Sequence, residues 1–353
     1  MQKALSFLIL LILLSCGSEP AKQTGLVATA AVKLEGKTMG TYYRVTYLDA
    51  GERDFQEDID QLLIEINQEV STYIDTATIS LINQSAERFS WPENVDEARL
   101  AHFMRNFEVA RMVFEKTDGN FDPTVMPLVN YWGFGYTEKK PVTDVDRKVI
   151  DSLMQYVGFA KVALDQQEGH FQLQKTAPDV QLDFSACAKG YAVDAVGELL
   201  EKQGVANYLV DIGGEARAKG QSPRGDDWKI GINVPKEGAA VDDIQVAVPL
   251  LNQAVATSGN YRNFYEVDGV KYSHTINPKT GFPERSRLLS VSVFAPSCAV
   301  ADAYATAFMV MGYDQAKMLA AQLPEIEAYF IVSQEDGTLQ TDYTSGLDKL
   351  FQN

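Results

Sequence analysis

The second half of this sequence constrains the fold most, because it is a succession of short strand-like segments joined by glycine-containing turns. These segments recur from about residue 160 onward, and helical patterns occur in blocks before and between them. Strands in succession with helices in separate blocks favour antiparallel sheets. The glycine pair after "NYLVDI" does not form G-x-G-x-x-G, which excludes a Rossmann reading. The sequence therefore predicts an α+β fold with mainly antiparallel sheets.

Length and charge limit the architecture and the class of partner. The chain has 353 residues, of which 46% are apolar, so it can bury a sizeable core. No period of about 20–50 residues repeats, which argues against a solenoid. We expect a single large domain over residues 32–353, built as two sub-domains. The net charge of −17 would repel a polyanion, so no nucleic-acid partner is expected.

The helical segments are expected near residues 55–73, 97–117 and 144–157. In the first of them an apolar residue recurs at helical spacing, which predicts one buried face. Tyr73 ends that stripe, so it is either the last core residue or the first residue of a functional site. A further helix is expected to begin near Ala188, with Ser185 as a candidate cap.

Three of the strand-like segments have a neighbour in the sequence that indicates how they pair or continue. Residues 34–48 read as a strand, a tight turn at Met-Gly-Thr and a second strand. "KVALD" and "HFQLQK" read as a hairpin. "VQLDF", residues 180–184, reads as a strand that leads into the helix beginning near Ala188.

The N-terminus is typical of an exported protein. After "MQK" comes "ALSFLILLILL", which is too short for a membrane-spanning helix of about 20 residues but suits a signal peptide. The following "LLSC" resembles a bacterial lipobox, which predicts a signal peptide over 1–15 and lipid attachment at Cys16. Residues 16–31 would then form the lipid anchor and a flexible tether. The alternative is an ordinary signal peptide in which Cys16 is incidental.

The segment "ADAYATAFMVMG" is the first candidate for chemistry. Asp302 and Thr306 lie four residues apart on an expected helix, so they share a face. Their oxygen atoms suit a hard cation such as Mg²⁺. A solvated helix edge is the usual reading of such a pair, but the neighbours here are apolar, and a carboxylate among them needs a partner or a metal.

Other segments add polar groups at the ends of expected strands and helices. Lys189 is placed in the first turn of a helix, where the dipole disfavours a cation unless an anion lies close by. "VATSGNYRNF" offers hydroxyl groups after a strand, and "NFDPTVMP" puts Asp122 before a proline in a rigid turn. His274 precedes the turn "NPKTG", where a structural hydrogen bond and a proton-transfer role are both open. Each of these segments is also compatible with plain packing.

Taken in order, eight segments resemble the motifs of the ApbE family, the FAD:protein FMN transferases. They are "MGTYY", "STYIDTATISLIN", "FDPTVMP", "LDFSACAKGYAVD", "LVDIGGE", "ATSGNY", "HTINPKTGFP" and "ADAYATA". The resemblance covers roughly residues 34–335. Two departures are Cys187, where an aliphatic residue is usual, and "DTATIS", which lacks the usual acidic residue and serine before Ile-Ser.

The resemblance implies an ApbE-like, T-fold-like architecture and a set of site residues. FAD, as the substrate, would be bound by Met39, Tyr73, Asn120, Phe121, Asp122, Asp183, Lys189 and Ile276. Mg²⁺ would be held by the backbone carbonyl of Ala186 and the side chains of Asp302 and Thr306. His274 would lie beside the reacting phosphate and accept a proton from a threonine of the acceptor.

The implied activity is Mg²⁺-dependent transfer of FMN from FAD to a Thr or Ser of an acceptor protein, with release of AMP. The implied acceptors are exported flavoprotein subunits of membrane redox complexes, met by an enzyme anchored to the cell envelope through its lipid. Two alternatives use the same site: hydrolysis of FAD to FMN and AMP, and non-catalytic flavin binding. A thiol-redox lipoprotein is disfavoured because no C-x-x-C occurs, and Cys187 and Cys298 are expected to be buried and free.

Overall fold

The structure is a computed structural model that describes residues 30–137, 142–167, 170–235, 243–260, 264–267 and 270–351. The predicted signal peptide, Cys16 and nearly all of the tether lie outside the described residues. Within the described ranges, no helix has both the length and the apolar character needed to cross a membrane.

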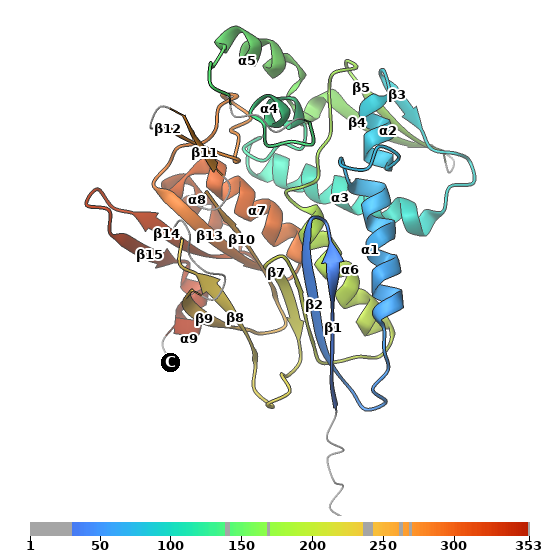
Figure 1. Ribbon diagram of the computed structural model, residues 1–353, viewed down its shortest axis with the longest axis vertical. Helices are drawn as coiled ribbons and strands as arrows, with labels where there is room; N and C mark the ends of the chain where they lie inside the picture. Colours follow the sequence, from blue (N-terminus) through green and yellow to red (C-terminus); the bar gives the residue numbers. More distant parts are fainter. Residues whose placement is uncertain are drawn as a thin grey trace, which may run out of the picture.

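An eight-stranded antiparallel sheet forms the centre of the molecule (Figure 1), in the order β1-β2-β6-β7-β10-β13-β14-β15. Its strands are β1 (Ala30–Thr38), β2 (Thr41–Asp49), β6 (Tyr208–Ile212), β7 (Glu215–Lys219), β10 (Ala254–Gly259), β13 (Leu288–Ala295), β14 (Glu327–Ser333) and β15 (Leu339–Tyr343). Smaller sheets are made by β3 (Arg88–Ser90), β5 (His170–Lys175) and β4 (Val162–Gln167), by β8 (Trp228–Asn233) with β9 (Ile244–Leu250), and by β11 (Phe264–Val267) with β12 (Val270–Ser273). The prediction of an α+β fold with antiparallel sheets is confirmed.

The helices are α1 (Gln56–Val70), α2 (Thr78–Gln84), α3 (Glu97–Lys116), α4 (Met126–Tyr131), α5 (Arg147–Leu153), α6 (Ala188–Lys202), α7 (Cys298–Met311), α8 (Tyr313–Ala320) and α9 (Asp348–Phe351). The main hydrophobic core lies where α1, α3, α6 and α7 pack together and against one face of the large sheet. Alternation along the strands separates the two faces: Ala254 and Ala256 of β10 contact this core, whereas Val255 belongs to a second cluster under β8 and β9.

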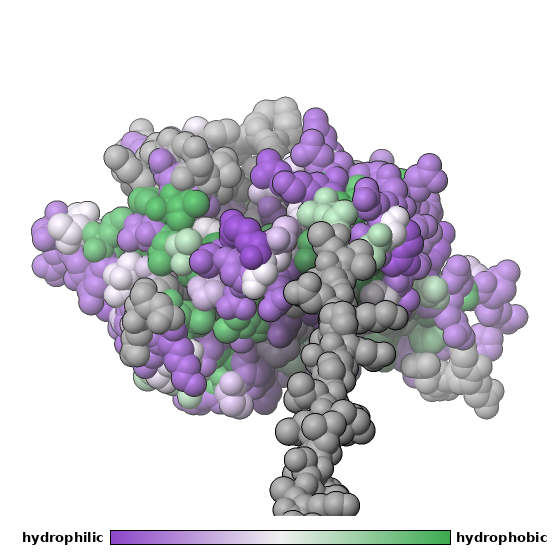
Figure 2. Space-filling model, turned by 90° about the horizontal axis from the view of Figure 1, so that it is seen from below, coloured by the Kyte–Doolittle hydropathy of each residue, from purple (hydrophilic) through white to green (hydrophobic). Residues whose placement is uncertain are grey.

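The face seen in Figure 2 is mainly hydrophilic. Hydrophilic residues cover most of the described surface in this view, and hydrophobic residues occupy smaller areas between them. This distribution agrees with a chain that is 22% charged and has a net charge of −17.

The expected elements and the observed ones differ in three places. The helix expected over 55–73 ends at Val70. The helix expected over 144–157 is shorter, because α5 ends at Leu153 and a 3₁₀ turn (Met154–Tyr156) follows. Residues 180–184 form no strand, although Val180, Leu182 and Phe184 are fully buried as alternation predicts. The backbone of Leu182 bonds instead to the side chain of Asn83, through N–H to Oδ1 (2.7 Å) and through C=O to Nδ2 (2.8 Å). A side chain therefore takes the place of a partner strand.

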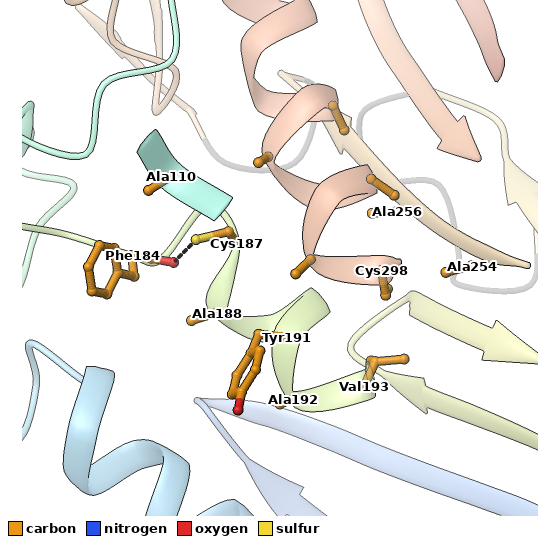
Figure 3. Packing of buried hydrophobic residues seen from close by; sticks show 14 of the residues in the cluster. Ala110, Phe184, Cys187, Ala188, Tyr191, Ala192, Val193, Ala254, Ala256 and Cys298 are labelled. Atoms are coloured by element: carbon orange, nitrogen blue, oxygen red, sulfur yellow. Dashed lines mark hydrogen bonds between the residues drawn. The ribbon is translucent and has the colours of Figure 1, made fainter. Parts of the chain in front are cut away.

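The two cysteines in the core are both free and buried, as expected. Figure 3 shows Cys187 at the start of α6 and Cys298 at the start of α7, both among buried apolar residues. The Cys187 thiol lies 3.5 Å from the carbonyl oxygen of Phe184, and the Cys298 thiol lies 3.7 Å from that of Val255. Burial raises the pKa of both thiols well above its ordinary value, so both stay protonated and inert.

Candidate active site

A cavity of about 580 Å³ opens where the β6–β7 turn, the end of β10 and the N-terminal ends of α6 and α7 come together. This volume lies in the range of ligand pockets, and its lining mixes polar and aromatic residues. Eight of the residues singled out from the sequence lie on its wall. They are Tyr73, Asp183, Ala186, Lys189, His274, Ile276, Asp302 and Thr306.

The other four residues implied by the resemblance lie outside this lining. Met39 is in the β1–β2 turn with a positive φ of 48°, packed against the core. Asn120 donates to the carbonyl of Thr117 (2.7 Å), and Phe121 is buried. Asp122 is also buried, and its carboxylate accepts from neighbouring groups of the protein itself, including the backbone N–H of Phe159 (3.2 Å).

Asp302 is a strongly perturbed acid on the wall. Only 4% of its surface is exposed, and its Oδ2 accepts from the backbone N–H of Gly190 (3.1 Å). Burial raises the pKa of Asp302 to about 7; the charge of Lys189 acts against that rise and the charge of Glu215 adds to it. A carboxylate whose ionisation is this costly indicates a site where a cation or a hydrogen-bond donor binds.

Thr306 lies one helical turn beyond Asp302 on the same face of α7, as its spacing predicts. Its Oγ1 is 3.4 Å from the Oγ of Ser258, so hydroxyl groups from α7 and from the end of β10 meet at the cavity. The neighbouring hydroxyl of Thr257 lies 2.7 Å from that of Ser292 on β13. Helix α7 and strand β10 thus present oxygen atoms side by side.

Lys189 faces an anion, but that anion belongs to the protein. It forms an ion pair with Glu215, the first residue of β7, whose own surface is only 5% exposed. Burial lowers the pKa of Lys189, but the charges of Asp302 and Glu215 outweigh this effect and raise it above its ordinary value. The second oxygen of Glu215, Oε2, has no hydrogen-bond partner within the described part of the chain. A buried acceptor without a partner is a feature that a bound group would satisfy.

The segment before α6 is held by a local turn rather than by a helix cap. Asp183 accepts from the backbone N–H of Ser185 (2.8 Å) and from its hydroxyl (2.5 Å). The prediction that Ser185 caps α6 is therefore wrong: the N-cap residue is Cys187, which makes no side-chain cap bond in the described structure. Burial raises the pKa of Asp183. Asp183 and Ser185 both lie on the cavity wall.

His274 follows β12 and lies on the cavity wall, with its ring edge-to-face to Phe134 at 6.4 Å between centroids. The turn after it is closed by the bond from Gly281 N–H to the carbonyl of Asn277 (2.8 Å), and Gly281 has a positive φ of 78° that favours glycine. The next residue, Thr275, donates to the side chain of Asn260 (2.7 Å). The tight turn and this bond fix the backbone from which the imidazole projects.

Sequence reasoning missed several polar residues on the wall, among them Glu215, Asp211 and Tyr42. Glu215 and Asp211 flank the glycine pair of "LVDIGGE", a segment that was interpreted only for its backbone. Asp211 accepts from the N–H of Gly214 (2.9 Å), and burial raises its pKa. The sequence feature that could have identified them is an acidic residue on each side of a glycine turn at the end of a strand.

The oxygen groups around Asp302 fit a hard divalent cation. No cluster of three or more His, Cys, Asp or Glu side chains suited to a metal occurs in the described ranges. A metal at this place would therefore draw on the Asp302 carboxylate together with hydroxyl and backbone carbonyl oxygens, a donor set that suits Mg²⁺. Among the described residues, the wall carries Asp183, Asp211, Glu215 and Asp302 against one ammonium group, that of Lys189, so a phosphate ligand would be repelled there without an added cation.

Comparisons with known proteins agree with the resemblance found in the sequence. The sequence model described as the ApbE family matches residues 39–330. The FAD:protein FMN transferase of Vibrio cholerae is 37% identical over 334 residues, which cover 93% of this chain and 92% of that protein. That of Haemophilus influenzae is 35% identical over 327 residues, covering 91% and 92%.

Solved structures show the same fold. The structure described as flavin transferase ApbE from Vibrio cholerae superposes with a TM-score of 0.80 at 34% identity, covering 92% of this chain and 100% of that one. The apo form of the Pseudomonas stutzeri flavinyl transferase ApbE gives 0.79 at 32% identity, covering 92% and 98%. The resemblance found in the eight sequence motifs is confirmed.

Proposed function

This chain belongs to the ApbE family, and from that premise we propose that it is an FAD:protein FMN transferase. It would cleave the pyrophosphate of FAD, release AMP, and join FMN through a phosphoester bond to a Thr or Ser hydroxyl of an acceptor protein. The similarity to transferases of this name extends over more than nine-tenths of the chain.

One observation supports this activity most strongly. Residues from three distant parts of the sequence, Lys189, His274 and the Asp302–Thr306 face of α7, line one cavity. Phosphoryl transfer needs positioned charge and a proton acceptor more than covalent chemistry from the protein. This wall supplies an ammonium group, an imidazole and a set of oxygen donors within one pocket.

In the proposed reaction the acceptor hydroxyl oxygen forms a bond to the FMN phosphorus while the bond from that phosphorus to the AMP phosphate oxygen breaks. His274 accepts the hydroxyl proton, which is the role of a general base. The electron pair of the broken bond leaves with AMP. Lys189, held by Glu215, would contribute positive charge beside the phosphates.

We further propose that Mg²⁺ is required and is held by the Asp302 carboxylate, the Thr306 hydroxyl and the backbone carbonyl of Ala186. When bound, it would neutralise charge on the pyrophosphate. The high cost of ionising Asp302 and the acidic wall support a cation here. FAD would extend along the remaining wall, past Tyr73 and Ile276.

We propose that the acceptors are exported flavoprotein subunits of membrane redox complexes and that the enzyme is anchored to the cell envelope through a lipid on Cys16. The sequence "LLSC" and the following polar tether support this placement. The acceptor threonine would lie in a short segment of small residues, because the hydroxyl must approach to about 3–3.5 Å of a phosphorus in a site already filled by FAD.

The experiment is product analysis with FAD and Mg²⁺, with and without a peptide that carries such a segment. Transfer predicts that AMP is released mainly when the peptide is present and that free FMN stays low. FMN and AMP accumulating equally, whether or not the peptide is present, would show a hydrolase. No cleavage under any condition would leave only flavin binding.

A further inference from the structure

The N-terminal ends of α6 and α7 are joined by two hydrogen-bonded attachments that cross between the helices. Asp194 of α6 accepts from the backbone N–H of Cys298 through Oδ1 and from that of Ala299 through Oδ2, both at 3.0 Å. In the other direction, Asp302 of α7 accepts from the backbone N–H of Gly190. Each helix thus supplies a carboxylate to the first turn of the other.

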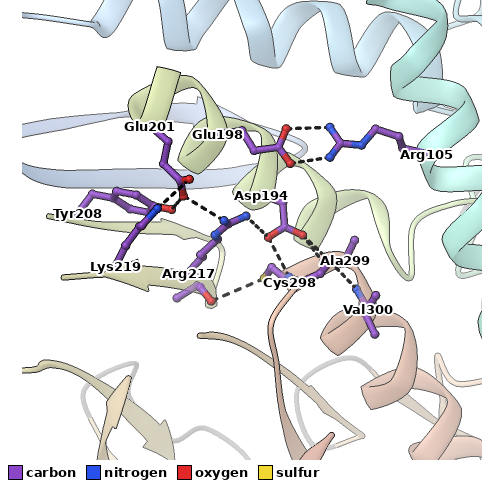
Figure 4. Close-up of polar contacts among 12 residues, drawn as sticks. Arg105, Asp194, Glu198, Glu201, Tyr208, Arg217, Lys219, Cys298, Ala299 and Val300 are labelled. Atoms are coloured by element: carbon purple, nitrogen blue, oxygen red, sulfur yellow. Dashed lines mark hydrogen bonds and ion pairs between the residues drawn. The ribbon is translucent and has the colours of Figure 1, made fainter. Parts of the chain in front are cut away.

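These carboxylates satisfy groups that the helices cannot satisfy themselves. The first N–H groups of a helix have no intrahelical acceptor, and their dipole favours a negative charge. Asp194 also accepts from the hydroxyl of Ser297 (2.7 Å), the N-cap residue of α7, and is paired with Arg217 (3.1 Å), as Figure 4 shows in part. Asp194 is only 5% exposed, so these partners account for a carboxylate that water does not reach.

The two attachments are one helical turn apart on each helix. Gly190 and Asp194 are four residues apart on α6, and Cys298 and Asp302 are four residues apart on α7, so both bonds lie on the facing sides of the two helices. The backbones are very close at this point: a Cβ on Gly190 would lie 2.3 Å from the carbonyl oxygen of Cys298. Two attachments fix both the distance and the rotation of α7 against α6.

We infer that Asp194 is a positioning residue of the active site, acting by holding the first turn of α7 so that Asp302 and Thr306 face the N-terminus of α6. Asp194 is not on the cavity wall. It lies behind the wall and fixes the register of the helix that carries both side chains. This inference rests on the proposed function, since Asp302 and Thr306 are its metal-binding groups.

Two variants disrupt the contact between the first turns of α6 and α7, one by removing a carboxylate and one by adding a methyl group. Asp194→Ala removes the caps of α7, and since Ala is a better helix former than Asp it does not weaken α6 itself. Gly190→Ala forces the backbones apart without adding charge. The matched control is Glu198→Gln, one turn further along α6, which loses a bidentate ion pair to Arg105 of α3 (2.5 and 2.9 Å) but has no bond to α7 in the described structure.

The first readout is hydrogen exchange of the Gly190 backbone N–H. Because Gly190 is the third residue of α6, its N–H depends on Asp302 for protection. We expect faster exchange of this N–H in Asp194→Ala and an unchanged rate in Glu198→Gln. This readout does not involve FAD, metal or turnover.

The second readout is binding of Mn²⁺, used as the probe ion, by electron paramagnetic resonance of the FAD-bound protein. Groups that orient metal ligands typically change metal affinity by about 10- to 100-fold. We expect the dissociation constant for Mn²⁺ to rise by about that factor in Asp194→Ala and Gly190→Ala, with KM for FAD changed by less than about twofold. Asp194→Asn should fall between wild type and Asp194→Ala, since its single carbonyl oxygen still accepts one N–H.

The two hypotheses fail in different ways. If the wild-type protein transfers FMN and binds Mn²⁺ but Asp194→Ala matches Glu198→Gln in both readouts, the inference is overturned and the proposed function stands. Equal loss of FAD and Mn²⁺ binding together with a lowered unfolding temperature would also overturn it, because that is the pattern of a general loss of structure. If the wild-type protein neither transfers FMN nor binds Mn²⁺, the proposed function fails, and the inference with it.

Discussion

Replacing Asp302 with asparagine should make the metal-free protein more stable and inactive at the same time. The carboxylate is 4% exposed and accepts from the N–H of Gly190, a bond that an asparagine oxygen can also accept. Asparagine is of nearly the same size, so no cavity forms. The substitution therefore removes mainly the cost of holding a negative charge in this position.

The magnitude follows from the pKa. Burial raises the pKa of Asp302 from 3.8 to about 7, and since each tenfold change in an equilibrium constant is worth about 1.4 kcal/mol, ionisation costs the folded state up to about 4 kcal/mol. The folded state binds the proton more tightly than the unfolded state, so stability is lost as pH rises from about 4 to about 7. Above this pH range the loss of stability is complete, and below it Asp302 is protonated and does not destabilise the folded state.

The assay is denaturant unfolding of both proteins in a chelating buffer at pH 4 and pH 8. We expect Asp302→Asn to be more stable than wild type at pH 8, by up to about 4 kcal/mol, and nearly equal at pH 4. Added Mg²⁺ should narrow the gap by stabilising only the wild type. Asp302→Asn should release no AMP from FAD.

Asp49→Asn is a control for which the expected change in stability at pH 8 has the opposite sign. The hydrogen bonds from Arg53 lower the pKa of Asp49 to about 2, so this carboxylate stabilises the folded state at neutral pH and Asp49→Asn should lower stability at pH 8. A gap between wild type and Asp302→Asn that is the same at both pH values, or an Asp302→Asn protein that is less stable at pH 8, would refute the reasoning about Asp302.

Three further changes test other parts of the site. His274→Ala should slow transfer by about 10²–10⁴-fold while FAD affinity changes little; unchanged turnover with weaker FAD binding would make His274 a binding residue only. Lys189→Met leaves the Glu215 carboxylate buried without its cation. Because Lys189 is partly exposed, we expect the free energy of unfolding at pH 7 to fall by about 3 kcal/mol, the low end for a broken buried ion pair. An unchanged midpoint of denaturant unfolding would contradict this. Cys16→Ala should move the protein from the membrane fraction to the soluble fraction, whereas continued sedimentation with membranes would argue against a lipid on Cys16.

Local sequence patterns predicted the parts of the site that lie within one element. The spacing of Asp302 and Thr306 placed them on one face of a helix, and the strand, turn and strand of residues 34–48 were found as β1 and β2. The start of α6 near Ala188 was also correct. These features depend on periodicity and turn residues, which a single segment carries by itself.

What the sequence did not reveal depends on contacts between distant segments. Gly190 and Asp302 are 112 residues apart, and no local pattern indicates that they bond. Residues 180–184 alternate like a strand, but the side chain of Asn83 binds the backbone there. Glu215 was overlooked because its burial arises only when β7 packs against the start of α6.

The most direct test of the central proposal is the intact mass of an acceptor after incubation with this enzyme, FAD and Mg²⁺. The acceptor carries a threonine among small residues, and the matched acceptor has that threonine replaced by alanine. We predict a gain equal to one FMN group on the first acceptor alone, with one AMP released for each group transferred, and none with Asp302→Ala enzyme. Accumulation of free FMN and AMP with no gain in mass on either acceptor would contradict the proposal.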